Sequence, residues 1–204
     1  MTKVIPLGHL LVRNIWPSLI AWWVVHIADY YLTIHTAHLY ETGLKEHVVL
    51  EGSFELTPAL QRDVDRLRRF SPRFVAALLL SSVVLLVLWF LAMRLLDLPE
   101  LFSFAIGALL LRELALLTRH IRNLVLFLTA RTPGSLSGRV QYARWVTLRI
   151  SATELFTFAG LFFLLYLAVG SWSLLGGTAS TLVSGVKHWS GSRKLYLSAQ
   201  RSIH

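Results

Sequence analysis

Long apolar runs separated by polar connections dominate the chain and predict an all-α integral membrane protein. The hydrocarbon layer of a bilayer is about 30 Å thick, which about 20 helical residues cross. Four runs are long enough, and they cover about 15–40, 74–96, 101–130 and 147–169. A weaker run at 172–187, rich in Gly, Ser and Thr, predicts either a fifth span or a re-entrant segment. The whole of 1–204 is therefore expected to form a single transmembrane bundle of four or five helices.

The long polar connection at 41–73 predicts one further helix, between the first and second spans. Thr57 and Pro58 form a typical helix start, an N-cap followed by proline at the first helical position. From about 58–70, apolar residues repeat at helical spacing opposite a basic side (Leu60, Val64 and Leu67 against Arg62, Arg66 and Arg69). This pattern predicts an amphipathic helix that lies on the membrane surface. A docking face for a partner protein is the alternative.

The distribution of lysine and arginine bears on the number of spans. The long loop 41–73 holds six of these residues, 131–149 hold four, and the basic tail (188–204, with Lys187 at its start) holds four. If the chain has four spans and the long loop is inside, 10 of the lysines and arginines in the connections and ends lie inside and 7 lie outside. Five spans place 14 of them inside and 3 outside. Cytoplasmic flanks carry an excess of these residues, so the rule favours five spans, while the weak apolar character of 172–187 favours four. The long loop is cytoplasmic in both arrangements.

The third run, 101–130, carries charges that do not belong in lipid. On a helix at about 100° per residue, five polar side chains share one stripe about 120° wide (Arg112, Glu113, Arg119, His120 and Asn123). The apolar residue Leu116 also lies within this stripe. Arg122 stands apart from this stripe. A charged side chain facing lipid at the bilayer centre costs about 2.5–3.5 kcal/mol on insertion scales. The stripe must therefore face other helices, a partner protein or water.

The first run carries a second polar stripe, about 80° wide on a helix, made of His26, Asp29, Thr33, Thr36 and Tyr40. Buried charges in membranes are generally paired, so we predict a network in which three acids face three arginines (Asp29, Glu113 and Glu154; Arg112, Arg119 and Arg122). His26, Thr33, His120 and Asn123 are its uncharged polar members. Such a network also serves simply to fix helix register. For Glu154, a capping box with Ser151 at a helix start is the alternative.

Composition narrows the classes of function. The chain has 204 residues, of which 55% are hydrophobic, and a formal net charge of +9. It has no cysteine, which excludes disulfides, cysteine-ligated zinc, iron–sulfur clusters and cysteine nucleophiles. Because its basic residues cluster beside apolar runs, the lipid bilayer and its anionic headgroups are the expected partners, and nucleic acid is not.

The polar stripes suggest several kinds of chemistry. An unperturbed histidine changes charge near neutral pH, so His26 and His120, with Asp29 one turn from His26, suit a path for protons or ions. The extra positive charge of the third run favours an anion instead. His26 and His120 also lie on two different runs, as the ligands of a haem between helices would. The sequence otherwise requires no cofactor, and we predict no metal site, because the weak ligand set His35, His38 and Glu41 lacks further partners.

Three functional hypotheses follow. The sequence contains no zinc-protease or nucleophile-elbow motif, so a non-enzymatic protein is favoured over an intramembrane enzyme built on Glu113, Arg119 and His120. The leading hypothesis is an accessory or structural subunit of a larger membrane complex, whose polar stripe is covered by other membrane chains or by copies of itself. An ion or proton channel, or a small transporter, is the alternative, and a haem-binding membrane protein is a lesser one.

Overall fold

The computed structural model describes residues 11–52 and 60–201. These residues are mostly helical (82%), which confirms the predicted α-helical class. Three helices are long and apolar enough to cross a membrane, namely Pro72–Leu95, Pro99–Ala130 and Arg144–Val169. This finding is compatible with an integral membrane protein.

The described elements follow one another as five long helices, one short helix and two short strands. In chain order they are α2 (Ile15–Leu39), β1 (Val48–Leu50), α3 (Gln61–Asp65), α4 (Pro72–Phe90), α5 (Pro99–Ala130), β2 (Val140–Tyr142), α6 (Arg144–Val169) and α7 (Trp172–Arg201). The helices α2 and α4 each continue into a π-helical turn, η1 (Tyr40–Leu44) and η2 (Leu91–Leu95).

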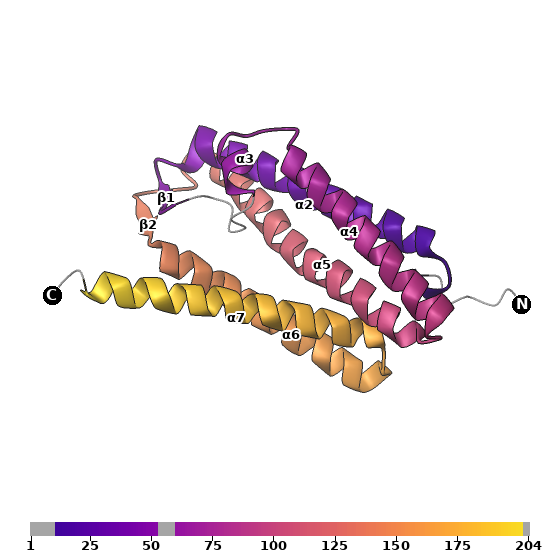
Figure 1. Cartoon of the computed structure of the whole chain (residues 1–204). Helices are drawn as coiled ribbons and strands as arrows, with labels where there is room; N and C mark the ends of the chain where they lie inside the picture. Colours follow the sequence, from indigo (N-terminus) through magenta and orange to yellow (C-terminus); the bar gives the residue numbers. More distant parts are fainter. Residues whose placement is uncertain (1–10, 53–59, 202–204) are drawn as a thin grey trace, which may run out of the picture.

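The long helices run back and forth in two arms (Figure 1). One arm contains α2, α4 and α5, and the other contains α6 and α7 side by side. The arms meet near the start of α5 and diverge toward the end of the molecule where β1 and β2 lie. There the two strands pair in parallel, with Val48 opposite Val140, and so connect the loop after α2 to the loop before α6.

Local sequence signals explain where the helices begin and end. The Asn14 side chain caps α2 by accepting a hydrogen bond from the Trp16 amide at 3.1 Å. Ser71 caps α4 in the same way, with Pro72 at the first helical position. The helix α6 ends at Gly170, whose φ of 70° is left-handed and favours glycine. Helix α7 then continues without a break to Arg201, so the 188–204 tail is helical as far as Arg201.

The prediction of a surface helix over 58–70 is wrong in its extent. The helix α3 has five residues, and Leu67 soon after it has a φ of 50°, which no α-helix contains. Asp63 causes this turn, because its buried carboxylate accepts hydrogen bonds from Ser71 at 2.6 Å and Arg68 at 3.3 Å. Val64 is buried against α2. The segment therefore folds onto α2 instead of continuing as a helix; residues 58 and 59 lie outside the described residues.

Glycines bring the two arms into backbone contact at one end. A Cβ atom added to Gly107 of α5 would lie 2.1 Å from the Ser173 carbonyl oxygen, and one added to Gly176 of α7 would lie 2.0 Å from the Phe104 carbonyl oxygen. Helices approach this closely only where side chains are absent. The pair Gly107 and Gly176 therefore forms a seam, called the glycine seam below, that closes the space between the arms at this end.

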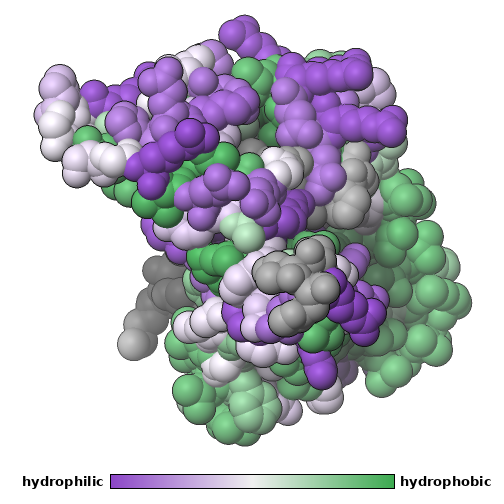
Figure 2. Space-filling model, turned by 90° about the vertical axis from the view of Figure 1, so that its left-hand side faces the viewer, coloured by the Kyte–Doolittle hydropathy of each residue, from purple (hydrophilic) through white to green (hydrophobic). Residues whose placement is uncertain are grey.

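The surface has an apolar side and a polar end. Exposed aliphatic side chains cover α4, including Leu79, Leu80, Val83, Leu86 and Val87. Figure 2 looks at the β1–β2 end and shows hydrophilic side chains gathered over it, with hydrophobic ones along its right-hand and lower edges. An apolar side is what contact with lipid requires, and a hydrophilic end is what contact with water requires.

Candidate functional site

A cavity of about 630 Å³ lies between the two arms. Its walls come from α2, α3, α5, α6 and α7, and it reaches β1 and β2, whose residues Val48, Leu50 and Tyr142 line it. Cavities that bind small molecules are typically about 300–1,000 Å³. The volume is therefore sufficient for a ligand of that class.

Next to this cavity, but not in its lining, the buried carboxylate of Glu113 joins α2 to α5. Glu113, whose side chain is 3% exposed, lies 2.7 Å from His26 Nδ1 through Oε1. Its other oxygen accepts a hydrogen bond from Arg112 at 3.2 Å. Arg112 lines the cavity, whereas Glu113 and His26 do not. Each oxygen of Glu113 thus has a polar partner, and Arg112 compensates its charge, as a buried carboxylate requires.

Aromatic rings enclose His26. Trp22 stacks on it with ring centroids 4.7 Å apart, and Phe74 stacks on it at 5.1 Å. Tyr30 extends the stack on Phe74 at 4.3 Å. Glu113 holds Nδ1 of the ring, while Nε2, the atom that would ligate a haem iron, is buried with no hydrogen-bond partner among the described residues, so haem binding by His26 stays a prediction.

A second polar group faces the cavity itself. His120 of α5 lies with Nε2 3.2 Å from Thr33 Oγ1 and 3.4 Å from Asp29 Oδ1, both on α2. The Thr33 hydroxyl donates to the Asp29 backbone carbonyl at 2.8 Å. All three residues line the cavity. Asp29 thus contacts His120 across α2 and α5, and its predicted pairing with an arginine stays a prediction.

A third group bridges the two arms. Arg119 of α5 donates from Nε to Glu154 Oε2 of α6 at 2.7 Å. Arg122 donates from Nη1 to the other oxygen of Glu154, and from Nη2 to Asn123 at 3.3 Å. Arg119 and Glu154 are largely enclosed, with 13% and 21% of their side chains exposed. The structure thus distributes the ten predicted residues over three groups, of which the second and third line the cavity.

Two residues in the cavity wall were missed at the level of sequence. Ser151 Oγ of α6 lies 2.7 Å from His188 Nδ1 of α7. The capping-box interpretation of Ser151 is wrong, because α6 begins two turns earlier, at Arg144. Ser151 shares a helix face with Glu154, which is a weak signal, but nothing in the sequence pairs it with a histidine 37 residues later.

The lining of the cavity combines positive charge with apolar surface. Its described cations outnumber its anions by five to two (Arg112, Arg119, Arg122, Arg144 and Lys187 against Asp29 and Glu154). Between them lie apolar side chains, including Leu116, Leu126, Phe127, Leu148 and Leu155. A molecule with an acidic head and an apolar tail is chemically complementary to such a lining.

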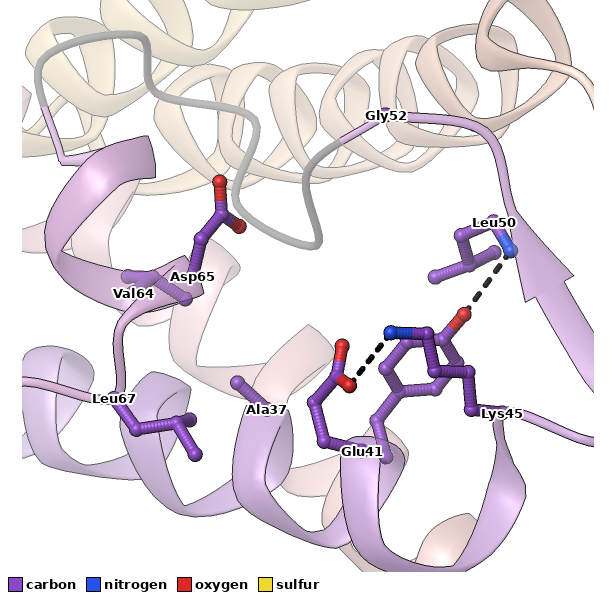
Figure 3. Close-up of a pocket in the computed structure, with 9 residues that line it drawn as sticks. Ala37, Glu41, Lys45, Leu50, Gly52, Val64, Asp65 and Leu67 are labelled. Carbon is purple, nitrogen blue, oxygen red and sulfur yellow. Dashed lines mark hydrogen bonds and ion pairs between the residues drawn. The ribbon is translucent and has the colours of Figure 1, made fainter.

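A second, far smaller pocket of about 80 Å³ lies among the end of α2, η1, β1 and α3 (Figure 3). Beside it, Lys45 donates to Glu41 at 2.7 Å, and the Tyr40 hydroxyl accepts from the Leu50 amide at 3.1 Å. The hydrogen bond and the charge of Glu41 raise the pKa of Lys45 above its usual value. Since the side chains of Glu41 and Lys45 are both exposed, we interpret this pocket as a shallow hollow in the surface.

The described ranges 11–52 and 60–201 contain no group of three or more His, Asp or Glu side chains placed to hold a metal ion. Comparisons with protein-family models, curated proteins and solved structures find no match to this chain. The cavity and its lining are therefore the features that indicate a function.

Proposed function

We propose that the chain is an integral membrane protein of five spans that binds an anionic amphipathic molecule, chemically a lipid with an acidic headgroup, in the cavity between its arms. The observation that carries this proposal is a cavity of about 630 Å³ with five cations, two anions and apolar walls. An excess of cations beside an apolar surface is the arrangement that an acidic headgroup with an acyl chain requires.

Five spans are supported by the arrangement of the helices. Helix α2 packs along α5, and α7 packs along both α5 and α6, so both accompany the three apolar helices. The loops 41–73 and 131–143, the start of α6 with Arg144 and Arg149, and the end of α7 then share one side of the membrane. That side carries 14 lysines and arginines against 3 on the other, which supports a cytoplasmic position for the long loop.

The depth of the cavity suits an amphipathic ligand. Its lining on α5 extends from Arg112 to Phe127, and fifteen residues of helix cover about 22 Å. Arg119 and Arg122 lie within this length, while leucines lie along it. An acidic head bound at the arginines leaves room beside them for part of an acyl chain.

The glycine seam supports a binding cavity over a continuous channel. At Gly107 and Gly176 the backbones of α5 and α7 are in contact, so an ion has no space to pass between these two helices at that level. The paired charges also remove the original reason to expect a covering subunit, since Glu113 and Glu154 meet arginines of this chain. Membership of a larger complex stays a prediction.

The test is equilibrium binding of a phosphatidylglycerol with a fluorescent acyl chain to the detergent-solubilised full chain, followed by anisotropy. We expect saturable binding that is at least tenfold tighter than that of the matching phosphatidylcholine. Arg119→Gln should weaken phosphatidylglycerol binding by roughly tenfold, which is ~1.4 kcal/mol. Arg139→Gln is the control, because Arg139 is exposed and lies outside the cavity lining. Equal affinity for the two lipids, or an unchanged affinity in Arg119→Gln, would contradict the proposal.

A further inference from the structure

A hydroxyl and an imidazole from different helices are joined in the wall of the cavity. Ser151 is 2% exposed in the whole chain, and its Oγ lies 2.7 Å from Nδ1 of His188. Both residues line the cavity. A serine nucleophile and its base lie about 2.6–3.2 Å apart, so the distance suits proton transfer from the hydroxyl to the ring.

A neighbouring serine shows how a purely structural hydroxyl behaves in this fold. Ser192 lies one turn after His188 on α7, is fully buried, and donates to the Trp145 backbone carbonyl at 2.7 Å. A backbone carbonyl cannot accept a proton in a reaction, so Ser192 has no base. It is also absent from the cavity lining. Ser151 differs from it in both respects.

An arginine that lines the same cavity as this pair supplies hydrogen-bond donors. Glu154 lies three residues after Ser151 on the same face of α6, and it holds Arg119 through Nε at 2.7 Å. A guanidinium carries five N–H groups, of which this bond uses one. Donors directed into an enclosed site stabilise the oxyanion that forms when a nucleophile attacks an ester.

We propose that Ser151 and His188 form a nucleophile–base pair that hydrolyses an acyl ester of the lipid bound in the cavity. This inference rests on the proposed function, because the cavity must first bind an esterified amphipath. Ser151 Oγ bonds to the ester carbonyl carbon while His188 takes the hydroxyl proton. The bond from that carbon to the alcohol oxygen breaks, and His188 returns the proton to the leaving oxygen.

Water completes the cycle without any other reactant. His188 takes a proton from a water molecule, whose oxygen bonds to the acyl carbon. The bond between that carbon and Ser151 Oγ breaks, and His188 returns the proton to the serine oxygen. The sum is one ester and one water converted to a carboxylic acid and an alcohol. Arg119, near the reacting carbonyl, stabilises the negative oxygen in both steps.

The first test uses a fluorophosphonate with a long alkyl chain, which reacts with base-activated serines, on the full chain in phosphatidylglycerol nanodiscs. We expect peptide mass spectrometry to find the label on Ser151 of the wild-type chain. Ser151→Ala should abolish labelling, His188→Gln should slow it by at least a hundredfold, and Ser192→Ala should leave it unchanged. Because the wild-type chain carries the first result, a variant that fails to fold does not decide the outcome.

The second measurement is the release of fatty acid from phosphatidylglycerol by the same samples, with lipid binding recorded separately. Release by wild type and by Ser192→Ala, but not by Ser151→Ala, would support the inference. A wild-type chain that binds phosphatidylglycerol but leaves Ser151 unlabelled and releases no fatty acid overturns the hydrolytic pair and leaves the binding proposal standing. A wild-type chain that binds no phosphatidylglycerol overturns both.

Discussion

Glu113 illustrates how this fold carries charge in its interior. Its carboxylate touches His26 on α2 and Arg112 on α5, and its side chain is 3% exposed. Removal of one partner from a buried pair leaves the other charge uncompensated, which generally costs more than the pair contributed. The helices α2 and α5 thus depend on Glu113 for their contact at this level.

We predict that Glu113→Gln destabilises the folded chain by about 3–5 kcal/mol, the usual cost of breaking a buried ion pair. The measurement is thermal unfolding of the detergent-solubilised protein by circular dichroism. Glu41→Gln is the matched control, since the pair of Glu41 with Lys45 is exposed to solvent at 43% and 58% of its side chains. Equal melting temperatures for the two variants would show that the Glu113 pair is not part of what holds the arm together.

Glu154 occupies the arginines that the ligand would use. It accepts hydrogen bonds from Arg119 and Arg122, so a bound acidic headgroup must compete with it. We predict that Glu154→Gln raises the affinity for phosphatidylglycerol by roughly tenfold, because the neutral amide frees both guanidiniums. The anisotropy titration with fluorescent phosphatidylglycerol measures this change. If the network is purely structural, Glu154→Gln should make the chain less stable and leave its affinity for the lipid no higher.

At the scale of elements, the contact between α5 and α7 sets the shape of the cavity. The glycine seam fixes these helices at one end, and Arg119 and Glu154 connect the arms farther along α5. The parallel pairing of β1 with β2 connects the loops at the other end. The cavity therefore has a fixed closed end and walls joined at several levels.

We predict that Gly176→Ala lowers the melting temperature and the stability by about 2 kcal/mol or more, because its Cβ would lie 2.0 Å from a backbone oxygen that cannot move aside. Gly160→Ala is the control. Gly160 lies in α6 with nothing within 4 Å of its added Cβ, so alanine should be neutral or stabilise the helix by up to about 1 kcal/mol. Similar melting temperatures would contradict the close approach of α5 and α7.

The sequence located the apolar runs well, since length and hydropathy alone define them, but it misjudged segments held by tertiary contacts. Periodicity predicted a helix over 58–70, whereas the buried carboxylate of Asp63 turns the chain after α3. Glycine content left a re-entrant segment open for 172–187, but Gly176 lies inside the continuous helix α7, where α5 packs on it. A helix-breaking residue and a helix-packing residue look alike without the partner helix.

Some features of the candidate site could likewise be predicted from the sequence, and others depend on tertiary contacts. Stripes on 15–40 and 101–130 grouped His26, Asp29 and Glu113 by helical geometry, which needs no knowledge of neighbouring helices. The contact of Asp29 with His120 depends on how α2 and α5 are rotated about their axes, which the stripes alone do not define. The pairing of Ser151 with His188 depends on α7, whose packing no local pattern encodes.

At the scale of the whole molecule, the loops that hold β1 and β2 lie together at one end, and the cavity reaches both strands. Because the chain has no cysteine, single cysteines report their side of the membrane directly. We predict that Glu46→Cys, Ser137→Cys and Gln200→Cys react with an impermeant maleimide only from the cytoplasmic side, and that Glu100→Cys reacts only from the opposite side. Reaction of Gln200→Cys on the same side as Glu100→Cys would indicate four spans instead of five.

The most direct measurement of the central claim is native mass spectrometry of the full chain released gently from membranes that contain both acidic and zwitterionic phospholipids. We predict a chain that retains an acidic phospholipid, and loss of that lipid when Arg119 and Arg122 are both replaced by glutamine. A chain that carries no lipid, or the same lipids after the double replacement, would contradict a ligand cavity. Recovery only in a complex with other polypeptides would direct attention back to a structural subunit.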